Sequence, residues 1–187
     1  MSTLFIKNMV CNRCILVLQR EFDRLGLAVK NISLGEVTLD KELTPGEKKK
    51  MEEAIIPLGF QVIDDKKSRI IEKIKNEIID LVHHRDNDTR KNLSDVLSSK
   101  LHHDYNYLSG LFSEVEGTTI EKYLIAQKVE RVKELLVYDE LSLSEIASRM
   151  HYSSVAYLSN QFKKVTGLTP SHFRQIREDK RKPLDEV

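Results

Sequence analysis

Two cysteines, Cys11 and Cys14, are three residues apart near the start of the chain, and the sequence contains no others. They lie where a predicted strand ends and a predicted helix begins, so that two thiolates can converge on one ion. Thiolates are soft donors that select Cu(I), or Zn(II) when further ligands join them. We expect the amides of the helix N-terminus and Arg13 to lower the pKa of the thiols. Met9 is either a third ligand or an apolar core residue.

The cysteine pair allows three interpretations, which the sequence leaves open. It can sense a metal, it can sense the thiol redox state, or it can belong to a fold that binds no effector. The redox interpretation lacks the Gly-Pro dipeptide of thioredoxin-like loops, and the sequence has no tryptophan beside the pair.

The first 65 residues alternate between strand and helix patterns. Thr44 is predicted to cap a helix that begins at Pro45, with Glu47 closing a capping box. Strands are predicted near residues 3–7, 27–32, 36–40 and 60–63, and helices near 14–25 and 45–57. This βαββαβ order is that of a ferredoxin-like fold.

The Met9-Val10-Cys11-Asn12-Arg13-Cys14 segment, in this fold context, resembles the Met-x-Cys-x-x-Cys loop of heavy-metal-associated domains. The resemblance implies that Cys11 and Cys14 are metal ligands and that Met9 is the loop methionine. It also implies that Phe60 shields the site. Arg13 is unusual for the loop of that family and leaves room for another effector.

Residues 66–187 show helical patterns throughout, after a predicted polar linker at residues 64–68. The pattern Leu-Ser-x-x-Phe-x-x-Val-x-Gly occurs twice, starting at Leu108 and Leu158, and each copy follows a short helix and a turn. Each copy ends at a glycine that can adopt the left-handed conformation of a helix C-cap. Helices are predicted near residues 69–83, 93–101, 104–116, 119–138, 143–150, 154–165 and 170–178. The fold class is therefore α+β, with a ferredoxin-like domain (1–65) followed by an all-α domain (66–187) with two helix-turn-helix units.

The helix near residues 119–138 connects the two units. At about 1.5 Å per residue it is about 30 Å long, and successive major-groove faces of B-DNA are about 34 Å apart. A rigid connector of this length favours two reading helices in neighbouring grooves.

Each repeat predicts one buried and one outward helix face. The buried faces are expected to contain Leu108, Leu111, Phe112 and Val115 in the first copy, and Leu158, Phe162 and Val165 in the second. The outward faces, which we predict to contact DNA, contain Tyr105, Asn106, Ser109, Gly110 and Ser113 in the first copy, and Val155, Ala156, Ser159, Asn160 and Lys163 in the second, with Lys164 beside them. Asn can pair with adenine, Val and Ala can contact thymine methyls, and the lysines suit phosphates. Thr118 and Thr169 are expected to cap the following helices, whose first amides can hold phosphates.

Three segments of the second half resemble AraC-type transcription regulators: Ile146 to Tyr152, Tyr157 to Lys164, and Gly167 to Arg174. The resemblance implies a two-unit DNA-binding domain of seven helices, promoter binding, and activation through RNA polymerase. The chain departs from the family at His151, where a glycine is usual, and at Gly110, where a long base-contacting side chain is common. The first departure predicts a positive φ at His151. The second raises the alternative that the first unit contacts only the DNA backbone or shape.

Composition excludes several classes of protein. The chain of 187 residues is 40% hydrophobic and 32% charged, which is typical of an ordered globular protein. No apolar run approaches the roughly 18 residues of a membrane span, and two cysteines cannot build a secreted disulfide scaffold. No phosphate loop, nucleophile elbow or catalytic carboxylate pair stands out, so we expect no enzyme. Residues 66–187 carry 21 basic and 19 acidic residues, so a DNA-binding prediction rests on pattern and not on net charge.

These patterns together predict a cytoplasmic transcription regulator that binds double-stranded promoter DNA and responds to Cu(I) or Zn(II) at the Cys-x-x-Cys loop. RNA polymerase is an expected partner, a membrane is not, and a homodimer is left open. The alternatives are a regulator that responds to thiol redox state or to no effector, and a metallochaperone-like carrier whose helical part is a protein-interaction module. The paired histidines at residues 83–84 and 102–103 are expected to meet helix C-termini and not a metal.

Overall fold

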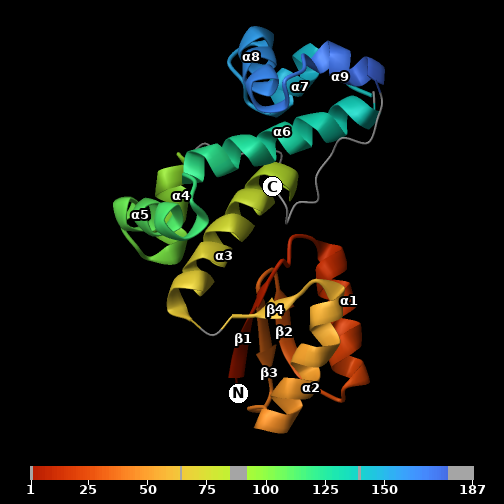
Figure 1. Ribbon diagram of the computed structural model, residues 1–187, viewed down its shortest axis with the longest axis vertical. Coiled ribbons are helices and arrows are strands. Elements are labelled where there is room, and N and C mark those ends of the chain that lie inside the picture. Colours follow the sequence, from red (N-terminus) through yellow and green to blue (C-terminus); the bar gives the residue numbers. More distant parts are fainter. Residues whose placement is uncertain (1, 64, 85–91, 139, 177–187) are drawn as a thin grey trace. The chain divides into compact units, whose positions relative to one another are not determined.

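The computed structural model describes residues 2–63, 65–84, 92–138 and 140–176. The chain divides into two compact units, residues 1–76 and 77–187, and the boundary falls between Asn76 and Glu77. Figure 1 shows a sheet and helices in the first unit and helices alone in the second. This confirms the predicted fold class; the domain boundary after residue 65 stays a prediction.

The first unit has the predicted βαββαβ order. Its elements are β1 (Ser2–Lys7), α1 (Asn12–Arg24), β2 (Val29–Ser33), β3 (Glu36–Leu39), α2 (Pro45–Ile55), the 3₁₀ turn η1 (Ile56–Leu58) and β4 (Gln61–Val62). The strands form one antiparallel sheet in the order β2-β3-β1-β4. Since β3 lies between the parallel strands β1 and β2, the connection through α1 is the split crossover of a ferredoxin-like fold.

Alternation along β1 separates the two faces of this sheet. Ile6 points into a core that it shares with Phe22 of α1 and Met51 of α2. Phe5 points to the other face, where the guanidinium of Arg69 lies 4.5 Å from the centre of its ring. Arg69 belongs to α3 (Lys66–Ile79), so residues of this helix cover the face opposite α1 and α2.

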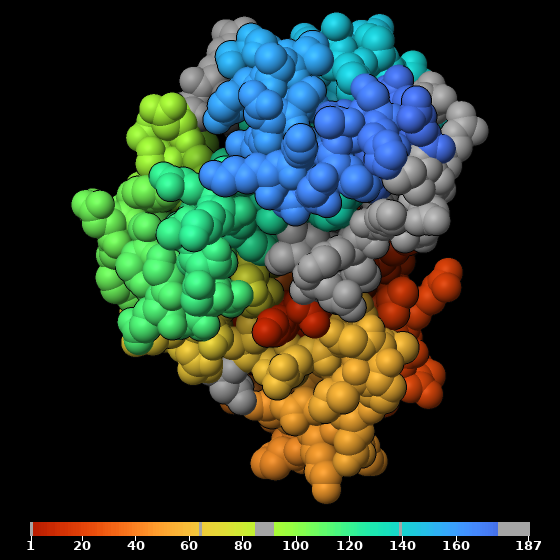
Figure 2. Space-filling view, turned by 45° about the horizontal axis from the view of Figure 1, so that its top comes forward, coloured from red at the N-terminus to blue at the C-terminus, as the bar shows by residue number. Residues whose placement is uncertain are grey.

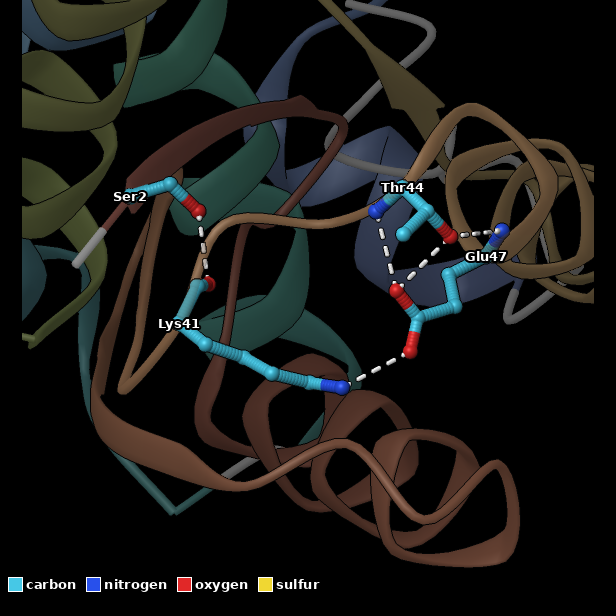
Figure 3. A network of polar contacts seen from close by, with 4 residues as sticks. All are labelled: Ser2, Lys41, Thr44 and Glu47. Atoms are coloured by element: carbon cyan, nitrogen blue, oxygen red, sulfur yellow. Dashed lines mark hydrogen bonds and ion pairs between the residues drawn. The ribbon is translucent and has the colours of Figure 1, made fainter.

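The start of α2 is held by the predicted capping box (Figure 3). The backbone amide of Thr44 donates to the carboxylate of Glu47 at 2.9 Å, and the amide of Glu47 donates to the hydroxyl of Thr44 at 3.3 Å. Lys41 forms an ion pair with the same carboxylate at 2.8 Å. This hydrogen bond from Lys41 and those from Thr44 lower the pKa of Glu47 to about 2.

The predicted linker is wrong for residues 66–68, because α3 begins at Lys66. Its start is fixed by Asp65, whose carboxylate accepts a hydrogen bond from the amide of Ser68 at 2.8 Å. A polar run therefore serves as a helix N-terminus. Asp64 lies outside the described residues.

The described residues of the second unit are helical between short turns. The elements that follow α3 are a π-helical turn, η2 (Asp80–His84), and the helices α4 (Leu93–Leu101), α5 (Tyr105–Glu116), α6 (Ile120–Tyr138), α7 (Leu143–Arg149), α8 (Val155–Thr166) and α9 (Pro170–Ile176). No helix among the described residues is both long enough and apolar enough to cross a membrane.

Candidate nucleic-acid interface

Two helix-turn-helix units, α4–α5 and α7–α8, lie along α6, which packs against both second helices (Figure 1). The second helix of each unit begins at an N-cap side chain and ends at a glycine, at equivalent positions of the repeat. At the starts, the side chains of Asp104 and Ser154 accept hydrogen bonds from the amides of Asn106 and Tyr157. At the ends, Gly117 and Gly167 adopt the left-handed conformation, with φ of 65° and 78°. The sequence repeat is therefore also a structural repeat.

The turn of each unit contains a histidine with positive φ. His151 has a φ of 53°, as predicted from its place at a usual glycine, and His102 has a φ of 54° as the C-cap of α4. Histidine adopts this conformation more readily than branched residues do.

The outward faces of α5 and α8 reach the surface. In each unit a pair of positions is exposed at the centre of this face: Asn106 and Gly110 in α5, and Ala156 and Asn160 in α8. Lys163 and Lys164 are exposed as well, whereas Tyr105, Ser109, Ser113, Val155 and Ser159 are partly buried. Figure 2 shows atoms of α5, in green, and of α8, in blue, on one side of the molecule. No predicted DNA-contacting residue is buried in the core.

The prediction that Val115 and Val165 are buried is wrong, because their exposed fractions are 46% and 48%. Both residues lie in the last turn of their helix, one residue before its end. Helical periodicity places both residues on the same side of the helix as the core residues, but the core does not extend as far as these last turns.

The helix starts that follow each repeat are capped by threonines. The amide of Lys122 donates to the hydroxyl of Thr119 at 3.2 Å, and that of His172 donates to Thr169 at 3.3 Å. The predicted cap at Thr118 is therefore one residue too early, and Thr119 is the equivalent of Thr169.

The connector α6 has 19 residues and, at about 1.5 Å per residue, is about 28 Å long. A buried polar chain fixes its first half: Gln127 donates to the hydroxyl of Tyr123 at 3.1 Å and meets the Nε2 atom of His83 at 2.9 Å. Burial lowers the pKa of His83 to about 4, so its imidazole is neutral at physiological pH.

The cysteine pair lies at the start of α1, where Cys11 is the N-cap residue. The two Sγ atoms are 3.6 Å apart, and the Sγ of Cys14 lies 3.8 Å from the carbonyl oxygen of Asn8. Met9 is fully buried in the core of the first unit, as is most of Phe60. Burial raises the pKa of Cys14 more than backbone hydrogen bonds lower it, so the expected lowering is wrong for this thiol.

The paired histidines at residues 83–84 and 102–103 are expected from the sequence to meet helix C-termini and not a metal ion. Among the described residues, no group of three or more His, Cys, Asp and Glu side chains is arranged to hold a metal ion. His83 is bonded to Gln127, and His84 lies 3.4 Å from Asp80.

Sequence reasoning missed two tyrosines, Tyr107 and Tyr157, which occupy equivalent positions in α5 and α8 and are exposed. The signal was present, because both repeats begin with Tyr-Leu-Ser and not with Leu-Ser.

Comparison with known proteins agrees with this arrangement. Residues 97–176 match the model of a helix-turn-helix domain family. An uncharacterized HTH-type transcriptional regulator of Bacillus subtilis, YtdP, is 28% identical over 103 residues, which are 54% of this chain but only 13% of that protein. The chain thus spans a small part of this curated relative.

Solved structures share the helical fold. The C-terminal domain of AraT, a response regulator from Geobacillus stearothermophilus, is 26% identical with a TM-score of 0.51, and the match covers 63% of this chain and 95% of that domain. A transcriptional regulator from Chromobacterium violaceum, described by its AraC-type DNA-binding domain, has the same fold with 20% identity and a TM-score of 0.50, over 58% of this chain and 96% of that one. The C-terminal half of the chain therefore contains an AraC-type helix-turn-helix DNA-binding domain.

Proposed function

We propose that this protein is a transcription regulator that binds promoter DNA through α5 and α8 and acts with RNA polymerase. The observation that carries the proposal is the repeated unit: two helices with N-cap side chains and glycine C-caps at equivalent positions, each presenting an exposed outward face, on one continuous connector. A connector of about 28 Å suits successive major-groove faces, which are about 34 Å apart.

Selection of the full-length protein on a pool of random duplexes tests the proposal, followed by affinity measurements over a range of salt concentrations. We expect an enriched sequence with two elements about one helical turn apart, and an affinity that falls as salt rises. No enriched sequence would contradict the proposal and favour a carrier with a helical interaction module.

Variants that change only the charge of a side chain test whether the outward faces of α5 and α8 contact DNA. Asn106→Asp and Asn160→Asp each add one negative charge to an exposed outward face without changing the size of the side chain. Repulsion from DNA phosphates should weaken binding for both. The matched control is Asn31→Asp, which makes the same change at an exposed position of β2 and should leave the affinity unchanged.

We further propose that Cys11 and Cys14 bind a soft metal ion and that this ion controls DNA binding, as their resemblance to heavy-metal-associated loops implies. The distance between their Sγ atoms, 3.6 Å, supports this. Two sulfurs at about 2.3 Å from a tetrahedral zinc are about 3.8 Å apart. Since no His, Asp or Glu side chain among the described residues joins the two cysteines in a metal-holding group, the remaining positions would be filled from outside. Met9 is buried and would support the loop from the core.

Titration with Zn(II) and with Cu(I), with DNA affinity measured at each point, tests the metal proposal. We expect a stoichiometric change in affinity that Cys11→Ser/Cys14→Ser abolishes, while metal-free DNA binding stays intact. An affinity that responds to thiol oxidation and not to either metal would replace metal sensing with redox sensing. If neither treatment changes the affinity, the pair has no sensory role.

A further inference from the structure

Tyr107 and Tyr157 are the third residues of α5 and α8, and their exposed fractions are 48% and 54%. The sequence places them 50 residues apart, which is the offset of the two repeats. Two exposed aromatic side chains therefore recur at equivalent positions of the two proposed reading helices.

Each of these tyrosines packs against a ring from the preceding turn. The ring centres of His103 and Tyr107 are 5.2 Å apart, and those of Tyr152 and Tyr157 are 6.0 Å apart, both in tilted geometry. The second supporting ring is itself fixed, because the hydroxyl of Tyr152 donates to Gln161 at 2.7 Å. The two exposed side chains therefore have restricted freedom in both units, which lowers the entropic cost of a contact.

The hydroxyl groups of the domain differ in what they bind. The hydroxyl of Tyr123 accepts a hydrogen bond from Gln127 in the interior, and that of Tyr152 donates to the partly buried Gln161. Among the residues that the structure describes, the hydroxyls of Tyr107 and Tyr157 have no hydrogen-bond partner. Each can therefore donate to a ligand without breaking a hydrogen bond to any other described residue.

The place of each tyrosine on its helix determines which part of DNA it can reach. The outward face is centred on Asn106 and Gly110 in α5, and on Ala156 and Asn160 in α8. Tyr107 and Tyr157 follow Asn106 and Ala156 by one residue, which turns them by about 100° around the helix. In a helix that lies in the major groove, side chains at the centre of the face meet base edges, whereas those at its flank meet the sugar-phosphate walls.

We propose that Tyr107 and Tyr157 each donate a hydrogen bond to a phosphate on the wall of the major groove, so that they position both reading helices without selecting sequence. The proposal rests on the DNA binding proposed above. Tyrosine hydroxyls are among the neutral donors that contact phosphates in protein–DNA complexes.

The experiment compares Tyr107→Phe and Tyr157→Phe with wild type on the selected duplex and on an unrelated duplex. Removing only the hydroxyl should weaken binding about tenfold per residue, because a hydrogen bond to a charged oxygen is lost. The loss should be equal on both duplexes. Tyr138→Phe, at an exposed position of α6, is the matched control and should bind as wild type does.

A duplex with single neutral methylphosphonates then identifies the partner atom. Wild type should lose affinity at one modified phosphate per helix, and the corresponding Phe variant should lose nothing further there. A loss confined to the selected sequence would overturn the proposal in favour of base contact, and unchanged affinity of both Phe variants would overturn it outright. Failure of wild type to bind DNA would instead refute the proposed function itself.

Discussion

The side-chain nitrogen of Lys128, in the middle of α6, donates a hydrogen bond to the carbonyl oxygen of Met150 at the end of α7, at 3.2 Å. The same nitrogen lies 5.2 Å from the centre of the Tyr152 ring. A cation at this place satisfies a carbonyl at a helix C-terminus and faces the negative end of the helix dipole. One residue thus joins the connector to the turn of the second helix-turn-helix unit.

Replacing Lys128 should loosen that unit. Lys128→Met keeps the aliphatic stem but removes the donor, and we expect a loss of about 1–2 kcal/mol in the free energy of unfolding. Urea denaturation monitored by circular dichroism measures it. Lys122→Met, at an exposed position in the first turn of the same helix, is the control and should change stability little. Equal effects of the two substitutions would contradict a specific role for the contact.

This contact also shows what the sequence can and cannot predict. The capping box of Thr44 and Glu47, and the left-handed glycines Gly117 and Gly167, depend on neighbours within a few residues and were predictable. Lys128 and Met150 are 22 residues apart and no local pattern joins them. Such contacts exist only once the helices have packed.

The candidate site likewise contains features that the local sequence predicts and features that it does not. Helical periodicity correctly excluded from the core the residues of the outward faces, such as Asn160. It could not show that the core ends before Val115 and Val165, because the extent of the core depends on neighbouring helices. The raised pKa of Cys14 has a similar origin, since burial by tertiary packing outweighs the local backbone hydrogen bonds that lower it.

The neutral imidazole of His83 predicts a pH dependence of stability. Burial lowers its pKa from 6.5 to about 4 in the folded protein. As the pH falls, the unfolded chain therefore binds a proton at His83 before the folded protein does. The contribution of this group to the stability of the fold is complete above pH 6.5 and is lost as the pH falls toward 4. Between pH 7 and pH 5, protonation of this group should lower the free energy of unfolding by on the order of 2 kcal/mol.

The test of His83 is a comparison of wild type with His83→Gln, which keeps a donor for Gln127 but does not titrate. The variant should lose less stability than wild type between pH 7 and pH 5. An NMR titration of His83 in the folded protein should have its midpoint near pH 4. Parallel pH profiles of the two proteins would show that the group does not control acid stability.

His151 has a left-handed backbone that glycine adopts without strain. With a φ of 53°, the substitution His151→Gly should stabilise the protein by about 1 kcal/mol. The same replacement at His172, inside α9, should destabilise it, because glycine weakens a helix. Thermal unfolding of both variants checks the opposite signs. If His151→Gly also destabilises, then the imidazole makes a contact that outweighs the backbone strain.

Gly110 lies inside α5 with open space beside it, since apart from its own chain neighbours and the adjacent helix backbone no described atom lies within 4 Å of a Cβ placed there. Gly110→Ala should therefore stabilise the helix by about 0.5–1 kcal/mol. Because a methyl group cannot donate or accept a hydrogen bond but can contact a thymine methyl, the selected DNA sequence should change by no more than a gained preference for thymine at one position. Gly117→Ala is the contrasting variant, as its φ of 65° makes any side chain costly. Any other change in the sequence preference of Gly110→Ala would show that the backbone at Gly110 approaches a base closely.

Asn160 and Lys163 lie on the same exposed face of α8 but should affect DNA binding in different ways. An amide can form two hydrogen bonds with adenine, so Asn160→Ala should lose about 1–3 kcal/mol of discrimination at one base pair. Lys163→Ala should weaken binding to all duplexes alike and reduce the slope of log affinity against log salt by about 1. Lys50→Ala, at an exposed position of α2, should alter neither quantity. Affinities measured on a panel of single-base variants at several salt concentrations separate the two effects. If Asn160→Ala changed only the salt slope, α8 would lie along the phosphates and not over the bases.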